Sequence, residues 1–129
     1  MTKVNRLVVT IASAVFLIAA PALAHHAFSG EFDGAKPIKL EGAVTRVDWK
    51  NPHVYFYVDV PGPDGHLANW ACETRGPSGL ERAGWTRDSL KTGDKVVVQG
   101  FLARDGSNTV DGRQVTLADG RKILSGSAK

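Results

Sequence analysis

Five stretches of the chain have strand patterns: apolar and polar residues alternate along the first, and the others are short, largely apolar runs between turns. The stretch His53–Val60 gives the strongest signal, because it is rich in β-branched and aromatic residues. The first stretch changes parity after Val44, which predicts a bulge or strong coiling in this strand, and Gly42 predicts a bend. The five predicted strands are Ile38–Trp49, His53–Val60, Leu67–Glu73, Lys95–Leu102 and Gln114–Leu117.

Turn-forming residues separate these strands, as at Asn51-Pro52 and Pro61–Gly65. A short helix is predicted at Leu80–Trp85, Thr86 is a candidate cap for one more turn, and Ala118–Leu124 has the pattern of a tight hairpin return. Three strands, a helix and two further strands are typical of an all-β domain with one short helix. We therefore expect a small five-stranded OB-like Greek-key β-barrel, with an unspecified small β-sandwich as the alternative.

The N-terminal segment has the three parts of a secretory signal peptide. Lys3 and Arg6 precede the uncharged apolar run Leu7–Ala20, and Pro21 then leads to an Ala-x-Ala sequence that ends at Ala24. A membrane anchor is the alternative, but a span needs about 20 apolar residues and this run is shorter. We expect residues 1–24 to be cleaved, residues 25–37 to form a lead-in segment, and residues 38–129 to form the barrel domain.

Cleavage changes the charge balance of the chain. The 129 residues carry 16 Lys and Arg against 13 Asp and Glu, a net charge of +3. Removal of 24 residues leaves 105, and the loss of Lys3 and Arg6 lowers the net charge to +1. Nucleic-acid binding therefore loses its electrostatic support. We expect a periplasmic or secreted protein with no membrane span after cleavage. A single Cys excludes an internal disulfide framework.

Five short motifs resemble a family of small exported bacterial proteins, the domain of unknown function 6152. The motifs are His25-His26-Ala27-Phe28 with Glu31-Phe32-Asp33, Trp49–His53, Asn69-Trp70-Ala71, Gly84–Leu90 and Val115–Arg121. The resemblance covers essentially the whole mature chain and implies export and a small β-barrel fold. It implies no activity, so the function has to be argued from the residues.

The histidines are the main chemical lead. Cleavage after Ala24 would make His25 the first residue, which combines a free α-amine with an imidazole as a bidentate chelate. A further imidazole, from His53 or alternatively from His26, would complete three nitrogen ligands, a set that favours copper over zinc. Glu31 and Asp33 are candidates to add an oxygen ligand or to orient an imidazole.

Simpler roles exist for the same histidines. His25 and His26 can belong to a frayed terminus without function. His53 can be a turn histidine that forms a hydrogen bond near Asn51, and His66 in the second turn is expected to be exposed and idle.

A second candidate site is an aromatic face on the second and third strands. If Val60 pairs with Leu67, Tyr57 lies opposite Trp70, and Tyr55 shares their face. In OB-type barrels this face is the usual ligand platform. It can instead be covered by the lead-in segment, including Phe28 and Phe32, and a shift of one residue in register would exchange the partners.

No residue pattern supports catalysis by side chains alone. Cys72 is predicted to be a small buried residue in a strand, with no base beside it in the sequence. Two functions remain. One is an exported metal-binding protein, with copper preferred and zinc second. The other is an accessory module that binds a peptide, a glycan, a small ligand or a periplasmic partner protein through Tyr55, Tyr57 and Trp70.

Overall fold

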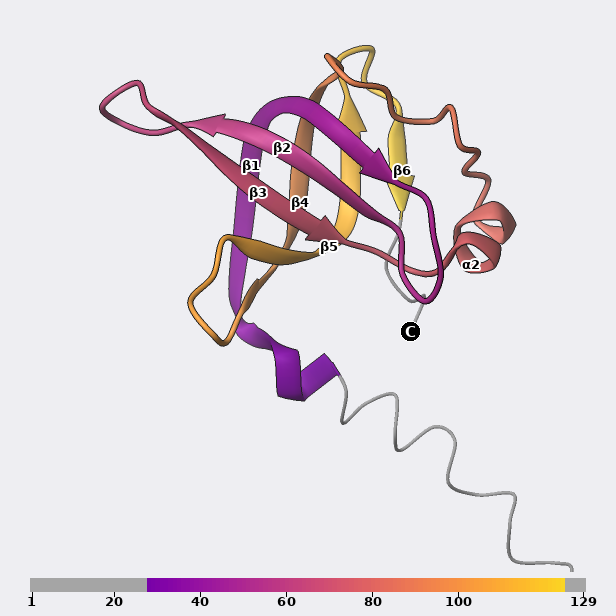
Figure 1. Ribbon diagram of the computed structural model, residues 1–129, viewed down its shortest axis with the longest axis horizontal. Helices are drawn as coiled ribbons and strands as arrows, with labels where there is room; N and C mark the ends of the chain where they lie inside the picture. The colour runs from indigo at the N-terminus through magenta and orange to yellow at the C-terminus, as the bar shows by residue number, and fades with distance from the viewer. Residues whose placement is uncertain (1–27, 125–129) are drawn as a thin grey trace, which may run out of the picture. The chain divides into compact units, whose positions relative to one another are not determined.

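The structure is a computed structural model that describes residues 28–124 and is mostly β (Figure 1). The strands all belong to the compact unit that begins at Glu31. In this described part, a helical turn at 28–31 precedes the first strand. The elements are β1 (Phe32–Asp48), β2 (Tyr55–Pro61), β3 (Leu67–Glu73), α2 (Pro77–Arg82), β4 (Lys95–Ala103), β5 (Thr109–Leu117) and β6 (Lys122–Leu124).

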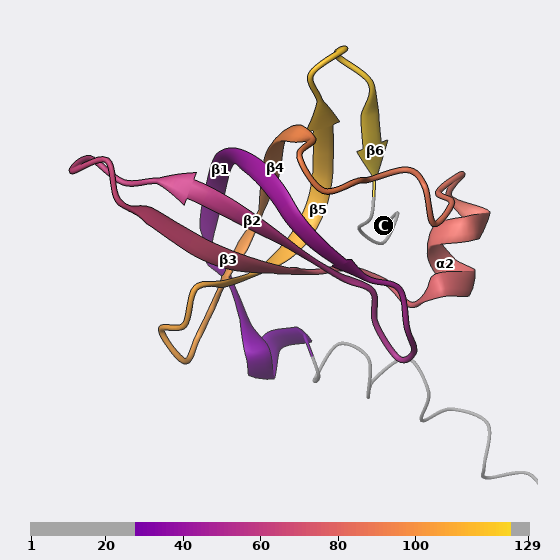
Figure 2. The same cartoon turned by 45° about the horizontal axis from the view of Figure 1, so that its top comes forward.

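The first five strands form a closed ring. β1 pairs antiparallel with both β2 and β4, β2 pairs with β3, and β4 pairs with β5. A parallel pairing between β3 and β5 closes the ring, and it joins Ala71–Glu73 to Thr109–Asp111 (Figures 1 and 2). The short β6 pairs antiparallel with β5, which confirms the predicted hairpin return at Ala118–Leu124 and adds a sixth strand to the five of the ring.

The long first strand changes its pairing partner at the predicted bend. Residues up to Ala43 pair with β4, and residues from Ala43 onward pair with β2. A Cβ atom on Gly42 would overlap the carbonyl oxygen of Asp59, so only glycine permits this close approach. The register slips between Val44 and Arg46, which confirms the predicted bulge.

β1 begins at Phe32 rather than at Ile38, so the end of the expected lead-in segment belongs to this strand. The pairing with β4 is irregular between Phe32 and Pro37. An irregular stretch lacks the two-residue periodicity by which strands are predicted, which explains why the sequence pattern missed it.

The helical region is also displaced from its prediction. α2 occupies Pro77–Arg82 instead of Leu80–Trp85, and it begins at a proline, whose missing N–H costs nothing in a first turn. Gly84 follows with a φ of 91°, a left-handed conformation that ends the helix. Thr86 does not begin a further helix. Its hydroxyl accepts a hydrogen bond from the backbone N–H of Asp88 within a turn.

The core fills the inside of the ring. Leu80 of α2 and the following Trp85 and Leu90 join the side chains of the strands. Figures 1 and 2 show α2 on the side away from the tip of the β2–β3 hairpin. Within residues 28–124, neither helical segment has the length and apolar character needed to cross a membrane. The buried core residues are Leu40, Val44, Val54, Phe56, Val58, Cys72, Leu80, Trp85, Leu90, Val96, Val98, Val110, Val115 and Leu117.

The register of the β2–β3 hairpin differs from the prediction by one residue. Pro61 pairs with Leu67, so that Trp70 lies opposite Val58 and not opposite Tyr57. Trp70 therefore points to the inner face, where it packs against the core. The predicted grouping of Trp70 with Tyr55 and Tyr57 is wrong, because a slip of one residue moves a side chain to the other face of a strand.

The bend of β1 yields a test of the fold. We expect Gly42→Ala to lower the free energy of unfolding by about 2–3 kcal/mol, because the added methyl group must displace the backbone of β2. Gly62→Ala is a matched control, because its Cβ would meet only the carboxylate of Asp64 and the carbonyl of His66 at 3.1 and 3.4 Å. Urea unfolding of both variants measures the difference, and equal losses would contradict the close approach at Gly42.

Candidate functional site

One row of outward-facing residues crosses the seam where the ring closes. Cross-strand pairing places Tyr55 of β2 beside Glu73 of β3, Glu73 beside Asp111 of β5, and Asp111 beside Phe101 of β4. Paired residues share one face of a sheet. The next row, which contains Phe56, Cys72 and Val110, is fully buried in the core. The first row therefore lies on the outside of the ring and combines acidic and aromatic side chains.

Glu73 is the centre of this row. It is a carboxylate with only 8% of its surface exposed, and both of its oxygens have a partner. Tyr55 donates its hydroxyl proton to Oε2 at 2.5 Å, and Nδ1 of His53 contacts Oε1 as an ion pair or hydrogen bond. A buried carboxylate is costly unless it is hydrogen-bonded, and these two donors offset that cost.

Backbone contacts hold His53 in place beside Glu73. Two backbone hydrogen bonds join Val54 to the residues that follow β3. The N–H of Val54 donates to the carbonyl of Arg75 at 3.0 Å, and the N–H of Thr74 donates to the carbonyl of Val54 at 3.0 Å. The hydroxyl of Thr74 also donates to the carbonyl of Val54, at 2.8 Å. His53 therefore precedes a fixed strand end, although 45% of its side chain remains exposed.

The bond to Glu73 determines what the imidazole of His53 can do. A neutral imidazole carries its proton on one nitrogen and a lone pair on the other. When Nδ1–H donates to Glu73, the lone pair is on Nε2, and among the described residues Nε2 forms no hydrogen bond or ion pair. This nitrogen can therefore accept a proton or coordinate a metal.

The electrostatic environment of the row disfavours further negative charge. Burial, the hydrogen bond to Glu73 and the charges of Glu73 and Glu31 together raise the pKa of Tyr55 well above its ordinary value of about 10. Tyr55 is therefore a proton donor to Glu73 and not a phenolate ligand. Burial also raises the pKa of Asp111, although the charge of Arg113 and its hydrogen bond to the Asp111 carboxylate oppose this effect.

The structure separates the two acidic residues that were predicted to assist His53. Glu31 lies near enough to Tyr55 for its charge to act on the hydroxyl, so it belongs to the surroundings of the His53–Glu73 pair. Asp33 instead faces two cations, with Nη2 of Arg104 at 3.7 Å from Oδ1 and Nζ of Lys36 at 3.8 Å from Oδ2. We therefore assign Asp33 a role in anchoring β1.

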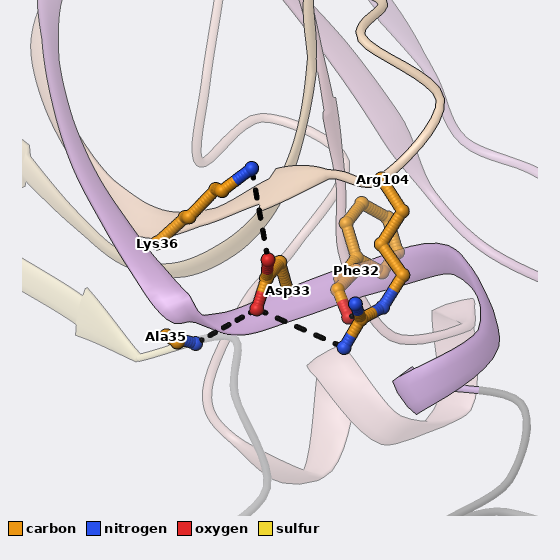
Figure 3. A network of polar contacts seen from close by, with 5 residues as sticks. All are labelled: Phe32, Asp33, Ala35, Lys36 and Arg104. Atoms are coloured by element: carbon orange, nitrogen blue, oxygen red, sulfur yellow. Dashed lines mark hydrogen bonds and ion pairs between the residues drawn. The ribbon is translucent and has the colours of Figure 1, made fainter.

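Figure 3 shows this anchor at the start of β1. Arg104 donates from Nε to the carbonyl of Phe32 at 3.1 Å, and its backbone N–H donates to the carbonyl of Glu31 at 2.8 Å. The N–H of Ala35 donates to Oδ1 of Asp33 at 3.1 Å. These bonds fix the chain at Glu31 against the end of β4.

Of the remaining histidines, His66 alone lies within residues 28–124. His25 and His26 lie outside the described residues, so their role stays a prediction. His66 is 88% exposed on the β2–β3 turn, and its Nδ1 lies 3.0 Å from Oδ2 of Asp64. Within residues 28–124, no three His, Cys, Asp or Glu side chains are grouped so that they could hold a metal ion by themselves.

The outer face of β2 and β3 is largely polar. The guanidinium of Arg46 lies 4.0 Å from the ring centre of Tyr57 and covers it. Asn69 donates to Oδ1 of Asp59 at 2.7 Å and to the hydroxyl of Thr45 at 3.2 Å. With Trp70 on the other face, this surface lacks the open aromatic platform that was predicted.

Glu73 and Asp111 were not found from the sequence. The only local signal for Glu73 is a charge that directly follows the buried Cys72 at the end of an apolar strand. Asp111 gives no such signal, because its proximity to Glu73 depends on the β3–β5 pairing between distant parts of the chain.

A family model described as a family of unknown function, DUF6152, matches residues 13–112. The chain belongs to the DUF6152 family. The match spans β1 to β4 and continues into β5 as far as Gly112. It therefore covers the β3–β5 seam and also His53, Tyr55, Glu73, Phe101 and Asp111 of this DUF6152 domain. No curated protein matches the sequence of this DUF6152 chain.

The raised pKa of Tyr55 can be measured directly. The chain has two tyrosines, so Tyr57→Phe leaves Tyr55 as the only one to ionise. We expect its ultraviolet absorbance to titrate well above pH 10, and a further Glu73→Gln change to lower this pKa by removing a charge. Titration at the ordinary value of about 10, with or without Glu73, would contradict the buried Tyr55–Glu73 bond.

The same pKa shift has a consequence for stability. A hydroxyl that holds its proton more tightly in the folded state stabilises the fold below the unfolded pKa of about 10. This contribution is lost as the pH rises above 10 toward the folded pKa. Tyr55→Phe should remove that part of the alkaline loss of stability, as measured by urea unfolding at pH 8 and above.

Proposed function

We propose that this protein is an exported copper-binding protein in which His53 supplies one ligand and the mature N-terminal His25 supplies two. The observation that carries the proposal is the pairing of Nδ1 of His53 with the buried carboxylate of Glu73. Histidine ligands of metals commonly donate their other ring N–H to a carboxylate, which fixes the tautomer and increases the basicity of the coordinating nitrogen. Nε2 of His53 is the nitrogen placed for coordination.

The second part of the site depends on export. The basic start, the apolar run Leu7–Ala20 and the Ala-x-Ala sequence support a signal peptide cleaved after Ala24, and a periplasmic or secreted location for the product. The new terminus would offer the α-amine and the imidazole of His25. Together with His53 these make three nitrogen ligands, which favour Cu(II) over Zn(II) in a tetragonal geometry.

The length of the chain is compatible with this arrangement. Glu31 is six positions after His25; the helical turn at 28–31 rises about 1.5 Å per residue, and the three residues before it add about 10 Å when extended. The charge of Glu31 acts on Tyr55, which binds the same carboxylate as His53. His26 is an alternative ligand from the same segment, and Glu31 is the acidic residue best placed to assist.

We further propose that the ring is an OB-type Greek-key barrel. Three features support this assignment: the pairing of β1 with both β2 and β4, the parallel closure between β3 and β5, and the position of α2 between β3 and β4. In this interpretation β6 is an addition to the five strands of the barrel.

The alternative function is an accessory module that binds a peptide, glycan or periplasmic protein through the outer face of β2 and β3. This face has less support, because Arg46 covers Tyr57, Tyr55 is bonded to Glu73, and Trp70 lies on the inner face. The two functions also respond to different variants. Loss of His53 affects copper binding, whereas loss of Tyr57 affects only a face-binding partner.

Copper titration tests the proposal. We expect Cu(II) to bind the protein that begins at His25 with one equivalent and an electron paramagnetic resonance spectrum of nitrogen coordination. One extra N-terminal residue, or His53→Ala, should each weaken binding by about tenfold or more, which corresponds to about 1.4 kcal/mol. His66→Ala is the matched control, because His66 is exposed and lies on the β2–β3 turn. Equal affinities for all four proteins would contradict the proposal.

The role of Glu73 in copper binding can be tested separately. We expect Glu73→Gln to weaken Cu(II) binding by about 10–100-fold, because an amide does not hold the His53 tautomer as a carboxylate does. Asp59→Asn on the same hairpin is the matched control, since its carboxylate binds Asn69 and not a histidine. An unchanged affinity in Glu73→Gln, with the fold intact by circular dichroism, would contradict the assigned role.

A further inference from the structure

A groove of about 570 Å³ lies on the outer face of β1, β4 and β5. This volume is within the usual range for sites that bind small organic molecules. Its apolar lining comes from Pro37 and Phe101, which pair across β1 and β4 and share the outer face. The groove adjoins the outward-facing row at Phe101, but neither His53 nor any residue of β2 or β3 lines it.

A β-bulge places a cation over the floor of this groove. The β4–β5 register slips between Gln99 and Gly100, so that Arg113 lies between two paired positions of β5. Its guanidinium lies 5.8 Å from the ring centre of Phe101. The ion pair between Nε of Arg113 and Asp111 holds it in this orientation. Bulges are common at binding sites because they redirect a side chain in this way.

The charge of the lining has one sign. Lys39 and Arg113 are cations, and no acidic residue lines the groove. Lys39 contacts Glu41 at 2.7 Å, but Glu41 lies outside the lining. The polar remainder consists of the side-chain amides of Gln99 and Gln114, which are 3.3 Å apart. An apolar floor with two cations and two amides at its edge matches a molecule that has an apolar body and one anionic end.

We propose that this groove binds a small organic carboxylate, with its apolar body against Phe101 and Pro37 and its carboxylate beside Arg113 and Lys39. Arginine suits this role because its planar group stacks on an aromatic ring and matches the geometry of a carboxylate. The proposal does not depend on copper binding, since neither His53 nor Glu73 lines the groove.

The test is a titration with 4-phenylbutyrate followed by nuclear magnetic resonance. The reporters are the backbone amides of Gly100 and Phe101 and the side-chain amide of Gln114. We expect saturable shifts of these signals with 4-phenylbutyrate. The matching alcohol, 4-phenylbutanol, and inorganic phosphate should bind at least about tenfold more weakly, because each lacks one half of the recognised chemistry. Equal binding of the alcohol, equal binding of phosphate, or no saturable shift would each overturn the proposal.

Variants separate the groove from general effects of charge. Arg113→Gln should weaken 4-phenylbutyrate binding about tenfold, and Lys39→Gln should weaken it less, because Lys39 is more exposed. Lys122→Gln on β6 is the control with the same charge change outside the groove, and it should leave the affinity unchanged. If Arg113→Gln alters the fold, Lys39→Gln and Phe101→Leu still test the site through the same reporters. Equal effects of Lys39→Gln and Lys122→Gln would contradict the proposal.

Discussion

The parallel pairing between β3 and β5 is the interaction on which the rest of the structure depends. It covers only Ala71–Glu73 and Thr109–Asp111, yet it converts a row of antiparallel strands into a closed ring. Closure requires strands to approach closely at their bends, and Gly42 and Gly100 lack the Cβ atoms that would overlap a neighbouring carbonyl group. The same closure buries Cys72 and Val110 inside and brings Glu73 beside Asp111 outside.

A buried acid is expensive, and the molecule shows how that cost is offset. Glu73 keeps two donors, Tyr55 and His53, and the nearby Asp111 keeps Arg113. Replacing Tyr55 or His53 with an apolar residue would leave one buried oxygen of Glu73 without a hydrogen bond. This loss destabilises the fold more than replacing the whole polar group with apolar residues of the same shape. One consequence of the arrangement is that the carboxylate of Glu73 orients the half-exposed imidazole of His53.

The sequence predicted most of the strands but little of the site. Periodicity is a local property, so it identified β2, β3 and β4 and the bend and bulge of β1. It missed the start of β1, where pairing is irregular, and the hairpin register, which depends on whether the turn begins after Val60 or after Pro61. His53 was identified as a candidate from its chemistry. Its partner Glu73 and the proximity of Asp111 follow from pairing between strands, which no local pattern records.

The contacts of Glu73 differ in their sequence separation, and this difference divides the site into two parts. His53 and Tyr55 reach Glu73 within a single hairpin, over 18 to 20 residues, whereas Asp111 reaches it from a strand 38 residues further along the chain. A contact between distant residues costs more loop-closure entropy than a contact within one hairpin. The hairpin thus determines the geometry of the imidazole, and ring closure determines the dielectric environment around it. If the β2–β3 hairpin were grafted onto another protein, it would keep the geometry of the His53 imidazole but lose the dielectric environment that ring closure provides.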